Sequence, residues 1–251
     1  MAKFFLKGRV FPLFLCLIAV MIYTGCSDDK SPTGSIDTYE FTVTYDSFSS
    51  LLNLADLPVY TIEKQQAVKI SDLVDTSVVT EPVNHAYRII GSDGFYAHMK
   101  GDPDNIWEHI KNGYIVLSTM GVTFDTTLEL IKRYNIKDAA KLKILRKIDF
   151  ITPADSLIQY IIDEMPPSAF EDSLTGIALN EFISEETVSS PASYVYELVA
   201  VDDYSKTLTY EQFQKGFYVI EQDRVLYTDP EIDGSLKIKQ LNRIIAKKPS
   251  K

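Results

Sequence analysis

The sequence predicts a β-rich α+β fold in which two related domains follow a signal peptide and a flexible tether. An ordered series of residues recurs at a nearly constant spacing, and short apolar runs alternate with Asp, Gly and Pro turns. With 45% hydrophobic and 12% aromatic residues, the 251-residue chain can bury a core, which excludes a wholly disordered protein. The expected parts are the signal peptide at 1–25, the tether at 26–37, and the domains at 38–150 and 151–251.

Charge and the scarcity of reactive residues exclude several classes of function. Lys and Arg number 25 against 35 Asp and Glu, and the formal net charge of −10 argues against a nucleic-acid partner. The chain has two cysteines and three histidines, and it lacks the patterns of a Walker A loop, a G-x-S-x-G elbow, an H-E-x-x-H helix and a G-x-G-x-x-G turn. We therefore expect a protein that is not an enzyme.

Residues 1–25 have the order of a secretory signal peptide. Residues 1–9 carry three basic side chains and no acidic one, residues 10–22 are apolar, and small residues follow. The apolar run is too short to cross a hydrocarbon layer of about 30 Å comfortably, although an uncleaved anchor stays an alternative. Cleavage removes the three basic residues, so the net charge changes from −10 to −13.

Thr24, Gly25 and Cys26 resemble the lipobox of bacterial lipoproteins, although Tyr23 stands where that family usually has leucine. In that family the cysteine receives a diacylglycerol, becomes the mature N-terminus and carries a further chain such as palmitate. Residues 27–30 (Ser-Asp-Asp-Lys) resemble the acidic export signal of surface lipoproteins in Bacteroidota. The resemblance implies lipidation of Cys26 and a surface-exposed position on the outer membrane of a Gram-negative bacterium, with the membrane as a partner.

The segment after this cysteine is expected to be a tether. Residues 27–37 are polar and contain Pro and Gly, and such a chain reaches roughly 18 Å on average. Two or more acyl chains hold a protein stably on a bilayer. Because Cys16 leaves with the signal peptide and Cys26 is lipidated, the folded part offers no thiol for a disulfide, a metal or catalysis.

An internal repeat predicts the two domains. Residues 57–99 align without gaps on 166–208, at a spacing of 109 residues. The spacing then becomes 103, because the first copy holds six extra residues, and 107–117 align on 210–220. Identical pairs include Pro58/Pro167, Val79/Val188, Pro82/Pro191, Tyr87/Tyr196, Asp93/Asp202 and Gly113/Gly216. A unit of roughly 100 residues can bury a core of its own.

Each copy predicts a tight hairpin. Residues 87–91 and 95–99 are expected strands around Asp93-Gly94, and Asp203 takes the place of this glycine in the second copy. Both Gly and Asp tolerate the positive φ that such a turn needs.

A short helix is expected after each hairpin. Residues 106–112 and 209–215 place an aromatic residue three positions before an apolar one, which puts both on one helical face. Gly113 and Gly216 are expected to end these helices with a positive φ. The strands expected next are 114–117 and 217–220.

Further segments complete the prediction. Residues 70–73 and 179–182 predict a strand that runs into a short capped turn. Residues 126–135 predict a helix that the second copy lacks. Near the end of each copy, 142–148 resembles 236–244.

The hairpin segments GSDGFYAHM and VAVDDYSKTLTYEQFQKGF resemble a recurrent "DGY" segment of domains similar to the molybdopterin-binding domain of sulfite-oxidase-type oxidoreductases. The resemblance implies a shared β-rich core. That family holds molybdenum through a cysteine thiolate, which the folded part of this chain lacks. We therefore expect no cofactor and transfer no catalytic residue. A cofactor-binding or oxidoreductase-like protein is the alternative that this resemblance supports.

Three histidines in the first copy, His85, His98 and His109, form a candidate metal site. The second copy has Tyr194, Thr207 and Gln212 at these positions, so the repeated fold does not need them. Surface or hydrogen-bonded histidines are the main expectation, and a metal-binding function is an alternative. A calcium site formed by the oxygen ligands of Asp102, Asp104 and Asn105, with Asp93 near them, is a further alternative to an exposed turn.

The abundant aromatic residues allow two interpretations. Residues kept as aromatic in both copies are expected in the two cores: Tyr87/Tyr196, Phe95/Tyr204, Trp107/Tyr210 and Tyr114/Phe217. The alternative is a stacking surface for glycans, formed by Tyr194, Tyr204, Tyr210 and Tyr218, or by Tyr96 and Tyr114.

Together these observations predict a lipid-anchored protein of the cell envelope, with two tandem β-rich modules that bind a glycan or a protein. Two like modules can raise avidity for a repetitive ligand. One site in a cleft between the modules is equally compatible with the sequence.

Overall fold

The structure is a computed structural model. It describes residues 39–96, 105–124, 136–171, 174–229, 232 and 234–249. The expected signal peptide, Cys26, the expected tether, His98, the segment 100–104 and the helix expected at 126–135 lie outside the described residues. Residues 38–251 form one compact unit. No helix in the described ranges is long and apolar enough to cross a membrane.

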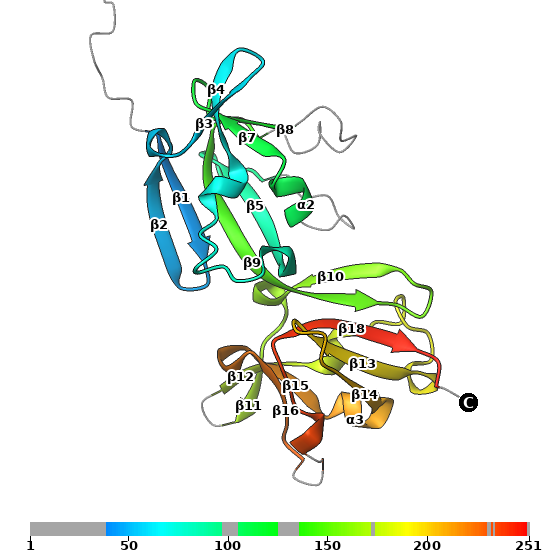
Figure 1. Cartoon of the computed structure of the whole chain (residues 1–251). Coiled ribbons are helices and arrows are strands. Elements are labelled where there is room, and N and C mark those ends of the chain that lie inside the picture. The colour runs from blue at the N-terminus through cyan, green and yellow to red at the C-terminus, as the bar shows by residue number, and fades with distance from the viewer. Residues whose placement is uncertain are drawn as a thin grey trace, which may run out of the picture. The chain divides into compact units, whose positions relative to one another are not determined.

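Strands dominate the unit, so the β-rich α+β prediction is confirmed. We call 39–146 the first half and 147–249 the second half. The largest sheet has nine strands and passes through both halves (Figure 1). Its strands in the first half are β1 (Glu40–Tyr45), β2 (Phe48–Asn53), β5 (His85–Gly91), β6 (Asn105–Ile106) and the start of β9 (Ala139–Ile151). Its strands in the second half are the end of β9, β10 (Leu157–Ile161), β13 (Val195–Ala200), β14 (Ser205–Thr209) and β18 (Leu241–Lys247).

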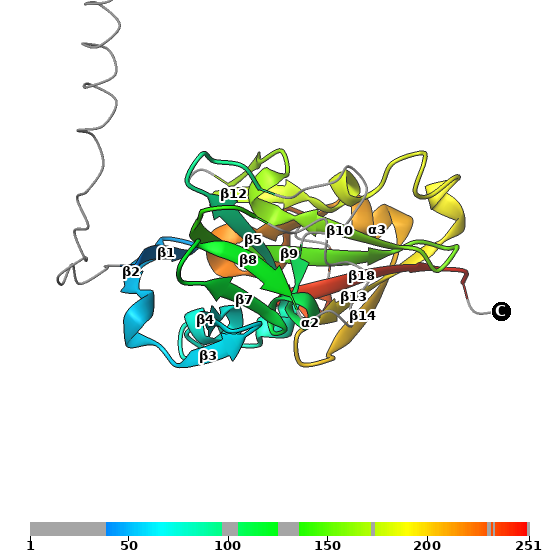
Figure 2. The ribbon, with the colours of Figure 1, turned by 90° about the horizontal axis from the view of Figure 1, so that it is seen from above.

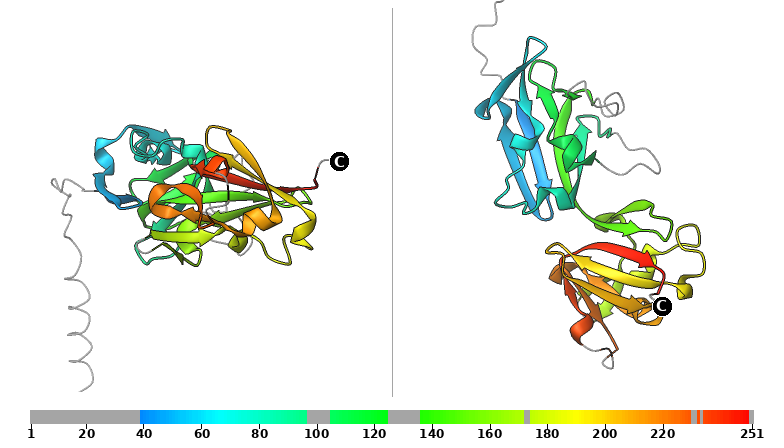
Figure 3. Two further views of the ribbon diagram at one scale, coloured as in Figure 1. Left: turned by 90° about the horizontal axis from the view of Figure 1, so that it is seen from below. Right: turned by 45° about the vertical axis from the view of Figure 1, so that its right-hand side comes forward.

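Each half has a second, smaller sheet. In the first half it consists of β3 (Val59–Ile62), β4 (Gln65–Lys69), β7 (Gly113–Val116) and β8 (Gly121–Phe124). In the second half it consists of β11 (Ser168–Glu171), β12 (Leu174–Ala178), β15 (Gly216–Val219), β16 (Arg224–Tyr227) and β17 (Ile238–Lys239). In the right-hand view of Figure 3 the blue-to-green strands and the yellow-to-red strands form two groups.

The helices are short. Within the described ranges the α-helices are α2 (Trp107–Ile110) and α3 (Tyr210–Gln214), at the places the sequence predicts. Thr209 caps α3, since its side chain accepts from the backbone N–H of Gln212, whose own side chain returns a bond to the Thr209 N–H. The 3-10 helices are η1 (Leu54–Asp56), η2 (Ile70–Leu73), η3 (Pro82–Asn84), η5 (Ile162–Glu164), η6 (Leu179–Phe182), η7 (Pro191–Ser193), η8 (Ile220–Gln222) and η9 (Gly234–Leu236).

The two halves have the same strand order on the two parts of β9. In the first half the order is β2-β1-β9-β5-β6, and in the second it is β10-β9-β18-β13-β14. The parallel pairing of β1 with β9 corresponds to the parallel pairing of β9 with β18, which lie side by side in Figure 2. Strand β9 is thus the last strand of the first pattern and the first of the second. The boundary expected at residue 150 falls within this strand, and the division into two domains stays a prediction.

Backbone conformation also corresponds between the halves. The paired residues with positive φ are Asp46/Asp155, Glu81/Ser190, Gly94/Asp203, Met120/Asp223 and Asp138/Gln240. The hydroxyl of Tyr87 donates to the carbonyl of Pro82 at 2.7 Å, and that of Tyr196 donates to the carbonyl of Pro191 at 3.1 Å. The strand register differs from one correspondence that the sequence predicts. Ile144 lies opposite Tyr87, and Ala246 lies opposite Tyr196. Residues 142–145 therefore correspond to 244–247 rather than to residues near 236.

Two further sequence expectations are wrong. Gly113 and Gly216 begin strands, and among the described glycines only Gly94 has a positive φ. Their role is close packing, because a Cβ atom at Gly113 would lie 2.6 Å from Ile70 Cδ1, and one at Gly216 would lie 2.6 Å from Leu179 Cδ1. Phe95 and Tyr204, expected in the cores, are 59% and 49% exposed, because each follows directly on the hairpin turn.

Strand β9 joins two hydrophobic cores. Successive side chains of a strand point to opposite faces, so alternate residues share a face. On one face of β9, Leu142 and Ile144 belong to the core of the first half, and Ile148 and Phe150 belong to the core of the second. Between them on the same face lies Arg146, which is where the two cores are interrupted.

Candidate functional site

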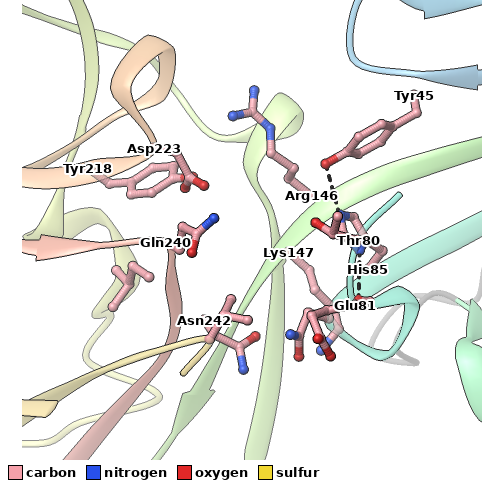
Figure 4. Close-up of a pocket in the computed structure, with 13 residues that line it drawn as sticks. Tyr45, Thr80, Glu81, His85, Arg146, Lys147, Tyr218, Asp223, Gln240 and Asn242 are labelled. Atoms are coloured by element: carbon pink, nitrogen blue, oxygen red, sulfur yellow. Dashed lines mark hydrogen bonds between the residues drawn. The ribbon is translucent and has the colours of Figure 1, made fainter. Parts of the chain in front are cut away.

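A small polar cavity lies at this interruption (Figure 4). Its volume of about 120 Å³ is below the 300–1,000 Å³ of sites that enclose a drug-sized ligand, so it has room for one functional group. The first half supplies Tyr45, Thr80, Glu81, Asn84, His85 and Arg146. The second half supplies Lys147, Val201, Tyr218, Asp223, Gln240, Leu241 and Asn242.

Arg146 is held by groups from both halves. Its Nε lies 3.1 Å from Asp46 Oδ1 in an ion pair that lacks hydrogen-bond geometry, and its Nη1 donates to the carbonyl of Ile220 at 3.2 Å. Burial of the guanidinium acts to lower its pKa, but nearby Tyr218 and the surrounding carboxylates outweigh burial, so the pKa of Arg146 is raised. The cation therefore stays charged and fixed in the wall.

Tyr218 and Asp223 form the opposite wall. The Tyr218 hydroxyl donates to Asp223 Oδ1 at 2.6 Å, and the ring is 2% exposed. Burial, and then the charge of Asp223, raise the pKa of Tyr218, so the phenol stays protonated and acts as a donor. Asp223 has a φ of 47°, which turns the chain between η8 and β16 and directs the carboxylate toward the cavity in Figure 4.

His85 is a structural donor and acceptor in the first-half wall. A carbonyl oxygen can only accept, so the contact of 3.2 Å to the Glu81 carbonyl assigns the proton to Nδ1. Nε2 then accepts from the Tyr45 hydroxyl at 3.0 Å. Burial, the largest cause, lowers the pKa of His85 from its ordinary 6.5, which favours the neutral ring. Both ring nitrogens are thus occupied by protein groups.

Lys147 is neutralised in the wall of the cavity. The residue is buried, and its Nζ lies 2.8 and 2.7 Å from the two oxygens of Asp149, its neighbour on the same strand face. Gln159 also donates to Asp149, at 3.2 Å. A buried charge needs such a partner, because leaving it unpaired costs several kcal/mol, about 3–5.

The cavity has an excess of negative charge and hydrogen-bond acceptors. Its two cations, Arg146 and Lys147, have five carboxylates on or near them: Glu81, Asp223, Asp46, Asp149 and Asp163. Asn242 Oδ1 is buried and accepts no hydrogen bond from the protein groups that the structure describes. A buried amide oxygen without a donor costs roughly 1–3 kcal/mol.

A comparison of corresponding positions in the two halves distinguishes residues that the fold requires from residues that differ at the cavity. Residues that shape the repeated backbone are the same in both halves, as Gly113/Gly216 and Tyr87/Tyr196 show. At the cavity the polar character changes: Tyr218/Ile115, Asp223/Met120, Asn242/Ala140 and Glu81/Ser190. Since Ile115 fills its core without a hydroxyl, the Tyr218 hydroxyl is not required by the fold.

An apolar slot adjoins the polar cavity. It has a volume of about 90 Å³ and a mostly apolar lining that includes Val43, Phe48, Leu52, Leu73, Val79 and Ile144. Tyr45 lines both spaces. Ile144 precedes Arg146 by two residues on one face of β9, and Val79 precedes Thr80, so the slot and the cavity are neighbours.

The predicted site residues are only partly described. Cys26 and His98 lie outside the described residues, and so do Asp102 and Asp104. His109 lies on α2, and burial, the largest cause, lowers its pKa. Within the described ranges, no group of three or more His, Cys, Asp or Glu residues is placed to hold a metal ion.

The aromatic residues proposed as a stacking surface differ widely in exposure. Tyr218 is buried, whereas Tyr204 and Tyr96 are 49% and 39% exposed. Tyr210 packs on Tyr196, with ring centroids 6.0 Å apart. Tyr218 therefore cannot offer a stacking face, and its contribution to a site is its hydroxyl.

Comparisons with known proteins return no match: no family model fits the chain, and no curated protein or solved structure is similar to it. The resemblances to lipoproteins and to sulfite-oxidase-type domains stay predictions.

Sequence reasoning allowed a site between the two modules but missed the residues that form the cavity. It treated Tyr218 as part of a surface and gave Arg146, Asp223 and Asn242 no role. A signal was available, since Tyr218 and Ile115 are aligned by the repeat and differ in polarity. The register of β9, which places Arg146 between the two cores, is not visible in the sequence.

Proposed function

We propose that this protein is a lipid-anchored binding module of the cell envelope, without catalytic activity, whose ligand binds in the cavity between the two halves. Lipidation of Cys26 holds it on the outer membrane, and the tether keeps the folded unit off the surface. The repeat arose by duplication, and the junction of the two copies became the site. A glycan or a protein of the envelope is the ligand.

The observation that supports this proposal is the polar cavity itself, built by both halves from residues that differ in polarity between them. The fold does not require the buried Tyr218 hydroxyl, which donates to Asp223. It also does not require Asn242 Oδ1, which accepts no hydrogen bond from the described groups. Polar groups that converge in a cavity without serving the core are typical of binding sites.

The test uses the tagged full-length protein and solubilised outer membranes. A variant that carries Glu81→Ser and Asn242→Ala takes the residues of the corresponding positions, so the backbone tolerates both changes. The matched control carries Ser190→Glu and Ala140→Asn, the reverse exchange outside the cavity. Sugar analysis and mass spectrometry measure what is enriched over an unrelated lipoprotein.

We expect a glycan or protein that the wild type and the control variant enrich and the cavity variant does not. If nothing is enriched over the unrelated lipoprotein, or if the cavity variant enriches it equally, the proposal is wrong. Anchoring is tested separately, because Cys26→Ser is expected to move the protein from the membrane fraction to the soluble fraction.

A further inference from the structure

We propose that the cavity binds a primary ammonium or guanidinium group, and that the short alkyl chain of this group lies in the adjoining apolar slot. This inference rests on the proposed function and specifies its ligand. The chemistry is that of a lysine or arginine side chain on a polypeptide, or of a free alkylamine.

The charge of the cavity favours a cation. The charges of Arg146 and Lys147 are taken up by Asp46 and Asp149, each in direct contact. Asp163 and Asp223 also lie near Arg146, and Glu81 lines the cavity, so five carboxylates surround two cations. The mature chain as a whole carries −13, so the field outside the cavity also attracts cations and repels anions.

The hydrogen-bonding groups favour a donor. Asn242 lines the cavity, and Asp223 uses one oxygen for Tyr218 and keeps the other as an acceptor. An ammonium group has three donors and a guanidinium five, and neither has an acceptor. Figure 4 shows Asp223 on the wall from the second half and Glu81 on the wall from the first half.

Size and position account for the alkyl chain. A cavity of about 120 Å³ admits a head group but not a large molecule. The slot beside it begins at Ile144, one strand repeat of roughly 6.6 Å from Arg146. The four-carbon stem of lysine is of comparable length, and apolar surface is where such stems are buried.

The experiment is a titration of the full-length protein in detergent, labelled with ¹³C at isoleucine methyl groups. The probes are ethylammonium, propylammonium and butylammonium, with butyrate and 1-butanol as the anionic and neutral analogues. Ile144 reports the slot, and Ile177 in the core of the second half is the internal control.

We expect butylammonium to shift the Ile144 methyl signal saturably and to leave Ile177 unchanged. Affinity should rise about fourfold with each methylene, from about 0.8 kcal/mol per buried group. The Glu81→Ser, Asn242→Ala variant should bind at least tenfold more weakly, and the Ser190→Glu, Ala140→Asn control should bind as the wild type does.

Butyrate or butanol binding as tightly as butylammonium would overturn the inference, and so would an Ile144 signal that does not move. If envelope capture still depends on the cavity in that case, the binding function stands and only the ligand class is wrong. Nα-acetyl-lysine methylamide distinguishes the sources: binding no weaker than that of butylammonium indicates a polypeptide side chain, and weaker binding indicates a free amine.

Discussion

Tyr218 donates a hydrogen bond of 2.6 Å to Asp223, although the corresponding residue of the first half, Ile115, fills the same core position without a hydroxyl. The bond connects a buried strand residue to a turn residue at the cavity wall. The fold alone does not require it, and it holds an anion beside Arg146.

Tyr218→Phe tests this relationship. It should lower the free energy of unfolding by about 1–2 kcal/mol, because one charge-assisted hydrogen bond is lost, and it should weaken ligand capture. Denaturant unfolding and the capture assay measure the two effects. Tyr196→Phe is the matched control, since it removes a bond to a carbonyl outside the cavity: a comparable loss of stability with full capture is expected. Equal loss of capture in both variants would contradict the assignment.

Gly113→Ala and Gly216→Ala should each destabilise the protein by about 1–3 kcal/mol through overpacking. The added Cβ would meet Ile70 and Phe124 in one case and Leu179 in the other, all closer than 3.0 Å. Gly234→Ala is the control, because no atom lies within 4 Å of its added Cβ. The denaturant concentration at the midpoint of unfolding measures the stability of each variant. Equal midpoints for all three variants would show that close packing is not the reason for these glycines.

His85 should make stability depend on pH. Its pKa in the folded state lies below the ordinary 6.5, so the unfolded chain binds more protons at and below that pH. The contribution of His85 is therefore complete above about pH 7.5 and is lost as the pH falls through 6.5 toward the folded-state pKa. His109, whose pKa is also lowered, acts in the same direction.

Unfolding measured from pH 7.5 to 5 checks this dependence. His85→Gln should have a shallower loss of stability than the wild type. His109→Gln introduces the residue of the corresponding position in the second half. It should remove only the contribution of His109 to the pH dependence of stability. Identical pH profiles for the wild type and His85→Gln would show that the burial of His85 has no energetic consequence.

Glu164→Gln should weaken the contact between the halves. Arg88, which is 6% exposed, makes two contacts with the Glu164 carboxylate, one of them 3.1 Å long, from β5 to η5. The expected cost is about 1–3 kcal/mol and smaller at high salt, since Glu164 is half exposed. Glu197→Gln, which breaks a surface pair with Lys247, should cost about 0–1 kcal/mol. Equal costs would mean that burial of Arg88 adds nothing.

Local chemistry made much of the fold predictable. Asp203 adopts the positive φ expected of it because Asp tolerates that conformation, and the short helices lie where aromatic and apolar residues are three positions apart. Gly113 was assigned the wrong role, because its constraint is the side chain of Ile70, which lies 43 positions earlier in the sequence. Local patterns do not contain such contacts.

The cavity was beyond sequence reasoning for the same reason. Arg146 and Tyr218 are 72 positions apart, and they meet only because β9 continues from one set of strands into the next. A comparison of corresponding residues in the two copies recovers part of this information from the sequence. A polar residue that replaces an apolar one at a core position indicates a site. Applied to Tyr218 and Ile115, it identifies one wall of the cavity.

The most direct test of a ligand site between the halves is the methyl spectrum of the full-length protein, labelled at isoleucine and leucine, with and without the material captured from outer membranes. The account predicts shifts at Ile144 and Leu241, which line the slot and the cavity. Leu51 and Leu157, exposed on β2 and β10, should not move. Shifts at Leu51 or Leu157 with Ile144 and Leu241 unchanged would contradict the account.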